Sequence, residues 1–209
     1  MQITDFISLM LLIIFGLSYV LKLVLLNKNN RINANVLAKG NKEFSIYLTE
    51  LFVRTSSLLW LLTWLLEVFY HNQISSIIGH FFEYMFITYI GIIVTALGAG
   101  VFILSTVSMK TSWRVGIDKT TQTSLVTNGI YKFSRNPAFV GFNLMFIGVF
   151  LTYSGIVTLG VLVLNILAFH LLILQEEKHL LSAFGEDYVK YKRSVPRYFF
   201  KFNFIHYKI

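Results

Sequence analysis

Long apolar stretches alternate with short polar loops along the chain. Four windows carry few charges and are long enough to cross about 30 Å of hydrocarbon as helices of roughly 20 residues, near residues 3 to 26, 48 to 70, 83 to 107 and 155 to 175. A shorter apolar stretch covers residues 138 to 153, and Ser154 and Gly155 separate it from the last window. The pattern predicts an all-α, polytopic membrane helical bundle with about five transmembrane helices, the last two forming a hairpin.

The pattern changes after Lys178, where apolar and charged positions alternate with helical spacing. Such spacing is typical of an amphipathic helix that lies along a membrane interface, and its apolar positions are Leu180, Leu181, Phe184, Tyr188 and Tyr191. Gly185 is expected to break this segment into two pieces. Amphipathic C-terminal helices are therefore predicted to follow the fifth helix, whose inner end we place at Glu176 and Glu177.

The composition agrees with a membrane location. Of the 209 residues, 56% are apolar and 13% are charged, whereas charged residues make up roughly a quarter of a soluble domain. The length suits one compact unit, so residues 1–209 are expected to form a single membrane domain. Because the chain has no cysteine, disulfides, thiol nucleophiles and thiolate metal sites are excluded.

The positive charges indicate how the helices are oriented. The formal net charge is +8, and the cations gather in the loop after the first helix, in the loop after the third helix and in the tail, while the two other connections carry none. Lys and Arg near helix ends collect on the cytoplasmic side, so we expect the N-terminus outside and the C-terminus cytoplasmic. Lys22 and Arg54 lie at helix ends that face the first basic loop and can snorkel to it. This distribution favours a membrane protein over a protein that binds nucleic acid.

Two polar clusters flank the predicted hairpin. A basic and aromatic loop leads through Arg135 to Pro137, which suits the first turn of a helix. The acid pair Glu176 and Glu177 follows the hairpin, and acids near a helix C-terminus oppose the helix dipole. The pair is either a solvated helix end or an acid site balanced by a cation, and that cation would be Arg135, Lys132 or a bound ligand.

Two further features within the helices have structural and functional interpretations. Gly98 and Gly100 either let a neighbouring helix approach closely or leave room for a ligand. His170 lies inside the fifth helix and is either hydrogen-bonded to a neighbour or functional, because ionisable groups in a membrane are costly. Motifs for a Ser-His-Asp set, a His-Glu-x-x-His zinc site and a phosphate loop are missing from the sequence, and no metal site is predicted.

An ordered series of motifs resembles a known enzyme family. The series comprises Leu125–Tyr131, Arg135–Gly141, Glu176–Glu177, Phe184–Tyr188 and Tyr191–Pro196. It looks like the isoprenylcysteine carboxyl methyltransferase family, which is related to the phospholipid N-methyltransferases. Those enzymes share a Gly-x-Gly and a Glu-Glu signature similar to Gly98–Gly100 and Glu176–Glu177. The resemblance covers about residues 98 to 198.

The resemblance implies that S-adenosylmethionine binds between the last helices and the cytoplasmic tail. It implies a methyltransferase core at residues 81–209 that carries the cofactor pocket, after an N-terminal two-helix part at residues 1–80. The implied cofactor-binding residues are Gly98, Gly100, Leu125, Val126, Tyr131, Asn136, Pro137, Phe139, Glu176 and Glu177. The acid pair would hold the cofactor ammonium group, and the residues expected to take part in catalysis are Arg135, Glu176 and His170.

The acceptor expected from the resemblance is lipophilic. A carboxylate, as in isoprenylcysteine, or another small lipophilic molecule comes first, and a phospholipid or amine that is N-methylated is the alternative. The chain has Leu172 where the prenylcysteine enzymes have an arginine that meets the substrate, so the acceptor stays open. A non-catalytic membrane scaffold, a transporter subunit and a more distant resemblance to membrane sterol reductases are the remaining interpretations.

Overall fold

A computed structural model describes residues 2–82, 84–121 and 123–199 of the chain. The regular elements of these residues are five α-helices and two short 3-10 helices. The α-helices are α1 (Ile3–Asn30), α2 (Phe44–Ile78), α3 (Met85–Ser108), α4 (Pro137–Thr152) and α5 (Ile156–Ser194). The 3-10 helices, η1 (Lys110–Ser112) and η2 (Gly129–Lys132), lie in the loop between α3 and α4. The all-α fold class is confirmed.

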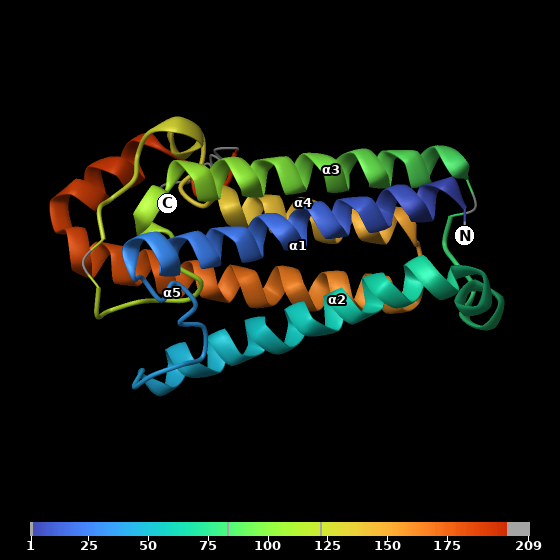
Figure 1. Ribbon diagram of the computed structural model, residues 1–209, viewed down its shortest axis with the longest axis horizontal. Helices are drawn as coiled ribbons and strands as arrows, with labels where there is room; N and C mark the ends of the chain where they lie inside the picture. The colour runs from blue at the N-terminus through green and yellow to red at the C-terminus, as the bar shows by residue number, and fades with distance from the viewer. Residues whose placement is uncertain (1, 83, 122, 200–209) are drawn as a thin grey trace, which may run out of the picture.

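The helices form an elongated bundle in which α3 packs on α4, and α2 packs on α5. Figure 1 shows the loop after α1, the loop after α3 and the last part of α5 together at one end of the bundle. The connections between α2 and α3 and between α4 and α5 lie at the opposite end (Figure 1). The predicted hairpin of α4 and α5 is therefore present, and the basic loops share one end.

Four helices are long and apolar enough to cross a membrane, namely α1, α2, α3 and α5. The remaining α-helix, α4, has only 16 residues. At about 1.5 Å per residue, this length is short of a full crossing. Much of α1 is exposed in the bundle, as expected of a helix that faces lipid. The chain is thus an integral, multi-pass membrane protein. The apolar part of α5 ends at Leu174, so the helix from Gln175 onward extends beyond the membrane-spanning part.

Glycines bring α3 and α4 into close contact. A Cβ atom added at Gly98 would lie 2.7 Å from the carbonyl oxygen of Gly141, and one added at Gly91 would lie 2.7 Å from that of Gly148. Distances this short leave no space for a side chain, so the two backbones touch along the helices. Small residues are the usual device for close helix packing in membranes.

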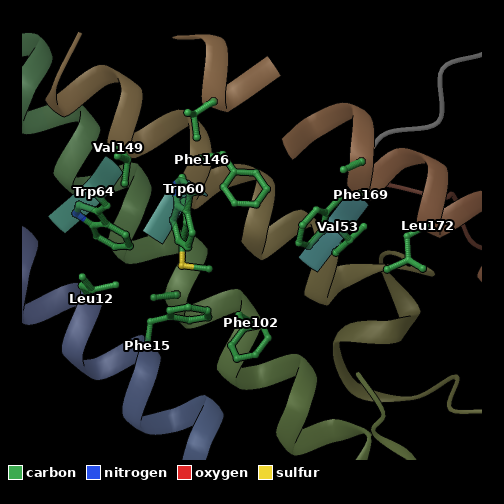
Figure 2. Packing of buried hydrophobic residues seen from close by; sticks show 14 of the residues in the cluster. Leu12, Phe15, Val53, Trp60, Trp64, Phe102, Phe146, Val149, Phe169 and Leu172 are labelled. Carbon is green, nitrogen blue, oxygen red and sulfur yellow. The ribbon is translucent and has the colours of Figure 1, made fainter. Parts of the chain in front are cut away.

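The aromatic core joins all the long helices. Figure 2 shows the rings of Phe15, Trp60 and Phe102, which come from α1, α2 and α3. Phe15 meets Trp60 and Phe102 edge-to-face, with ring centroids 6.2 and 5.1 Å apart, a favoured arrangement of aromatic pairs. Phe146 of α4 and Phe169 of α5 complete this layer, with centroids 5.1 Å apart.

The course of α5 corrects one expectation. The helix does not end at Glu176 and Glu177 but continues to Ser194. Its break lies at Gly185, as predicted, where φ is 50° and ψ is −124°. The chain reverses there, and the last turns of α5 lie across the end of the bundle (Figure 1). The acid pair is consequently inside a helix, so a helix C-terminus does not explain its environment.

Candidate functional site

A cavity of about 580 Å³ opens at the end of the bundle that carries the basic loops. Its wall is built from all five α-helices and from the loops after α1 and α3. Small-molecule and cofactor sites have volumes of roughly 300 to 1,000 Å³, so the cavity is large enough for such a ligand. Rings of the core form its apolar floor, including those of Phe15, Trp60 and Phe102.

The structure brings most of the sequence-predicted site residues to this cavity. Those in its wall are Leu125, Val126, Tyr131, Arg135, Asn136, Phe139 and Glu176. The others lie outside the wall, namely Gly98, Gly100, Pro137, His170 and Glu177. The first group comes from the loop before α4, the start of α4 and the middle of α5, which the fold gathers at one place.

Local structure explains how the loop residues reach the wall. Gly129 has a φ of 59°, which starts η2 and turns the chain back toward α3. Pro137 occupies the first turn of α4, where its missing N–H costs no hydrogen bond. Between these points the backbone N–H of Arg135 donates to the carbonyl oxygen of Pro196 at 2.9 Å. The chain after α5 therefore holds the loop in place.

Glu177 faces two arginines instead of the cavity. Its carboxylate accepts hydrogen bonds from Arg135 Nη2 at 2.8 Å and from Arg197 Nη2 at 2.9 Å. The side-chain amide of Asn136 also approaches it, at 3.3 Å. Burial raises the pKa of Glu177, but the hydrogen bonds from Arg197 and Arg135 outweigh it and lower the pKa to about 2. This carboxylate is therefore ionised and fully engaged in holding Arg135 and the tail.

Glu176 has the opposite environment. Its side chain lines the cavity, and it has no hydrogen-bond or ion-pair partner among residues 2–82, 84–121 and 123–199. Burial, and then the charges of Glu177 and Glu50, raise the pKa of Glu176 to about 7. A carboxylate in this position would be stabilised by a cationic ligand group, because an opposite charge nearby favours the ionised form.

Arg135 has one donor left over. Its Nη atoms bind Glu177 and the carbonyl oxygens of Lys192 and Val195. Its Nε atom is buried without a hydrogen-bond partner in the described part of the chain. Since buried donors are normally paired, this N–H group is an exception among the buried polar groups of the site.

The two glycines and His170 lie elsewhere. Gly98 is packed against α4, whereas a Cβ atom added at Gly100 would meet no atom within 4 Å, so Gly100 faces away from α4. The ring of His170 has its Nδ1 atom 2.8 Å from the hydroxyl oxygen of Tyr198. The close-packing interpretation thus describes Gly98, and the hydrogen-bonded interpretation describes His170.

Sequence reasoning missed the wall that α1 and α2 supply. Tyr19 of α1, Arg54 of α2 and Leu37 in the loop between these helices all line the cavity. The only sequence signal was the aromatic pair Phe15 and Tyr19, which lie four residues apart and share one helix face. His179, three residues after Glu176, also lines the cavity and was not selected.

Glu50 fastens the two loops that cover the cavity. Its side chain is 0% exposed and accepts hydrogen bonds from the backbone N–H groups of Ala38 and Ile117, both at 2.7 Å. Lys42 Nζ donates to the same carboxylate at 2.6 Å. Sequence reasoning did not select this residue, and its partners are 67 residues away at the farthest.

Comparison with known proteins identifies the part of the chain that carries this site. Residues 86–187 match the family model described as phospholipid methyltransferase. No match was found among curated proteins. The matched residues include α3, α4, Arg135, Glu176 and Glu177, whereas α1 and α2 precede them. The match confirms the resemblance to membrane methyltransferases, and methyltransferase activity is what this family implies. Residues 86–187 are therefore similar to the phospholipid methyltransferase family.

Proposed function

We propose that the protein transfers a methyl group from S-adenosylmethionine to a lipophilic acceptor in the 580 Å³ cavity. The observation that carries the proposal is the unpartnered carboxylate of Glu176 in the wall of a cavity whose floor is aromatic. The carboxylate suits a ligand with a cationic amino group, and the aromatic floor suits an apolar ligand. Both surfaces line the same cavity.

The residues of the wall fit the cofactor. Glu176 would hold the ammonium group, and the free Nε of Arg135 would bind the neighbouring carboxylate. Tyr131 and Phe139 would pack against the adenine or flank the sulfonium, whose charge an aromatic face attracts. Leu125 and Val126 would complete the apolar part of the pocket.

The residues outside the wall would act indirectly. Glu177 would position Arg135 through their 2.8 Å hydrogen bond. Asn136, which is in the wall, would support the same arrangement through its 3.3 Å contact with Glu177, and Pro137 would start α4 at the correct residue. Gly98 would serve helix packing. These are positioning roles, distinct from contact with the cofactor.

When bound, S-adenosylmethionine supplies an activated methyl group on a sulfonium. The protein would contribute alignment, which can account for up to roughly 7 to 11 kcal/mol of barrier reduction, and exclusion of water from the nucleophile. A carboxylate acceptor needs no general base, so we favour it. An amine acceptor is the second candidate, since His179 lines the cavity and its pKa is lowered by burial, which leaves its neutral imidazole able to accept a proton.

The cavity is proposed to face the cytoplasm. Its loops and the tail carry most of the lysines and arginines, and these residues collect on the cytoplasmic side of membrane proteins. The N-terminus would then lie outside. The soluble cofactor would enter from the cytoplasm, while the acceptor would come from the bilayer.

Calorimetry of purified protein with S-adenosylmethionine tests the cofactor site. Glu176→Gln should abolish measurable binding, because it removes the carboxylate opposite the ammonium group. Glu186→Gln is the matched control, since Glu186 is exposed and lies beyond Gly185 on the same helix. Equal affinities for the Glu176→Gln variant and the wild type would contradict the assignment.

The transfer itself is tested by incubating the protein with radiolabelled S-adenosylmethionine and a total membrane lipid extract. Label in a base-labile ester fraction would support a carboxylate acceptor, and label in an amine fraction would support the second candidate. A chain that neither binds the cofactor nor labels any lipid would be a scaffold of the same fold.

A further inference from the structure

The cations that line the cavity differ in whether the protein supplies them with a partner. Lys39 Nζ donates to the carbonyl oxygen of Asn35 at 3.2 Å. Arg114 pairs with Asp118, and Arg135 pairs with Glu177. Arg54 lines the same cavity but has no hydrogen bond or ion pair within the described ranges of the chain.

Arg54 lies beside a lateral opening of the cavity between α1 and α2. The cavity wall there includes Val20 of α1 and Leu58 of α2, which are 54% and 56% exposed. Apolar wall residues with this exposure leave the cavity open on that side. Figure 1 shows α1 and α2 drawing apart toward the end where the loop after α1 joins them.

The position of Arg54 separates it from the proposed cofactor site. The side-chain amide of Asn165 on α5 donates to the carbonyl oxygen of Ser56 at 3.1 Å, which aligns the two antiparallel helices. Arg54 is therefore level with about residue 167 of α5, roughly nine residues or 13 Å along the helix axis from Glu176. The two side chains thus start about two and a half helical turns apart, and the buried Nε of Arg135 is the donor assigned to the cofactor carboxylate, which leaves Arg54 for a different ligand.

An arginine at a lipid-facing opening requires an anionic partner. Leaving a guanidinium unpaired next to hydrocarbon is costly, and carboxylate or phosphate oxygens match its planar donors in a bidentate geometry. We propose that Arg54 is a specificity-determining residue that binds the acid group of a lipid acceptor, a carboxylate or a phosphate, which enters between α1 and α2. This inference rests on the proposed function and narrows its acceptor to acidic lipids.

Tryptophan fluorescence provides a binding assay that does not depend on catalysis. Trp60 and Trp113 line the cavity, so a brominated lipid that enters it should quench them. The probes are 9,10-dibromostearic acid, brominated phosphatidic acid and the methyl ester of dibromostearic acid as the neutral match, added to the full chain in detergent. The wild type should respond to one acid at about tenfold lower concentration than to the ester, and the more potent acid identifies the acid group.

The variants assign that preference to Arg54. Arg54→Gln should remove the roughly tenfold preference, which is the size expected for a lost charge-assisted hydrogen bond. Arg54→Lys should keep part of it, because the charge remains and the bidentate geometry is lost. Lys28→Gln, at an exposed cation on α1 outside the cavity wall, should leave it intact. An unchanged preference in Arg54→Gln, or a wild type that does not distinguish acid from ester, would overturn the inference.

Failure of the inference and failure of the proposed function give different results. A chain that binds acids through Arg54 but neither binds S-adenosylmethionine nor transfers its methyl group would contradict the function and leave the acid site standing. A chain that methylates neutral lipids equally well with and without Arg54 would support the function and refute the role of Arg54.

Discussion

The two helix pairs of the bundle are packed in opposite ways. The backbones of α3 and α4 touch through glycines, and this pair lies within the family match. In contrast, α1 and α2 diverge, and their residues line the cavity while facing lipid. The α1/α2 pair precedes the matched residues. The two halves therefore differ both in packing and in their relation to the family, and in the proposed function the open half is the one that admits the acceptor.

The largest effect is expected where the two halves are joined, at Glu50. Replacing Glu50 with Ala leaves Lys42 and the N–H groups of Ala38 and Ile117 without their partner, and breaking a buried ion pair in this way costs about 3 to 5 kcal/mol. Denaturant titration of the purified protein should show this loss. The exposed Lys119–Glu43 pair provides the control, and Glu43→Ala should have no measurable effect. Equal effects would mean that the loops are not fastened by Glu50.

The glycine contact between α3 and α4 should tolerate no added atom. In Gly148→Ala the new Cβ would lie 2.6 Å from the backbone nitrogen of Thr95, and overpacking of this kind costs about 1 to 3 kcal/mol. Gly16→Ala in the open half meets nothing within 4 Å and should be neutral or stabilising by up to about 1 kcal/mol. Thermal unfolding of both variants measures the two effects. Similar melting temperatures for Gly148→Ala and Gly16→Ala would contradict the difference in packing between the two halves.

The pH dependence of cofactor affinity should follow Glu176 and not Glu177. The pKa of Glu176 is raised to about 7, so its charge is present above pH 7 and is lost as the pH falls through that value. Affinity for S-adenosylmethionine should then decrease by up to about tenfold per pH unit below 7. Glu177, with a pKa of about 2, remains ionised over this range. Calorimetry between pH 5.5 and 8 gives the profile, and a flat profile would contradict the role of Glu176.

The smallest effect is expected from partly filling the open half. Ser57 of α2 lines the cavity, and Ser57→Phe should obstruct the acceptor while leaving the cofactor site unchanged. We expect KM for the acceptor to rise severalfold, with an unaltered Kd for S-adenosylmethionine. Ser45→Phe, at a position on the same helix outside the cavity wall, serves as the control. A parallel loss of cofactor affinity would show that the halves are not separable.

Much of the fold could be predicted from local patterns. Apolar windows predicted the long helices, Pro137 predicted the start of α4, and Gly185 predicted the break in α5. These features depend on residues that are adjacent in the chain, so the sequence contains their causes. The end of the fifth helix was placed wrongly at Glu176 and Glu177, because charged residues end a membrane span without ending the helix that forms it.

The site was harder to predict where it depends on distant contacts. The different environments of Glu176 and Glu177 follow from which side of α5 meets Arg135 and Arg197, about 20 to 42 residues away. The wall supplied by α1 and α2 follows from how these helices diverge, and an apolar residue that lines a cavity looks the same in the sequence as one that faces lipid. Arg54 is an example, because the sequence indicates only a cation near a helix end, whereas the structure places it in the cavity wall.

The reversal of α5 depends on the backbone conformation of Gly185. That conformation depends in turn on the chirality of the residue at this position. The φ of 50° and ψ of −124° at this residue are the mirror image of angles that an L-residue adopts readily, and no atom lies within 4 Å of its missing side chain. Space is therefore available, but only for the opposite enantiomer. A D-alanine introduced there by chemical ligation should preserve the bend, whereas L-alanine should straighten α5 and carry Tyr191 away from Tyr131.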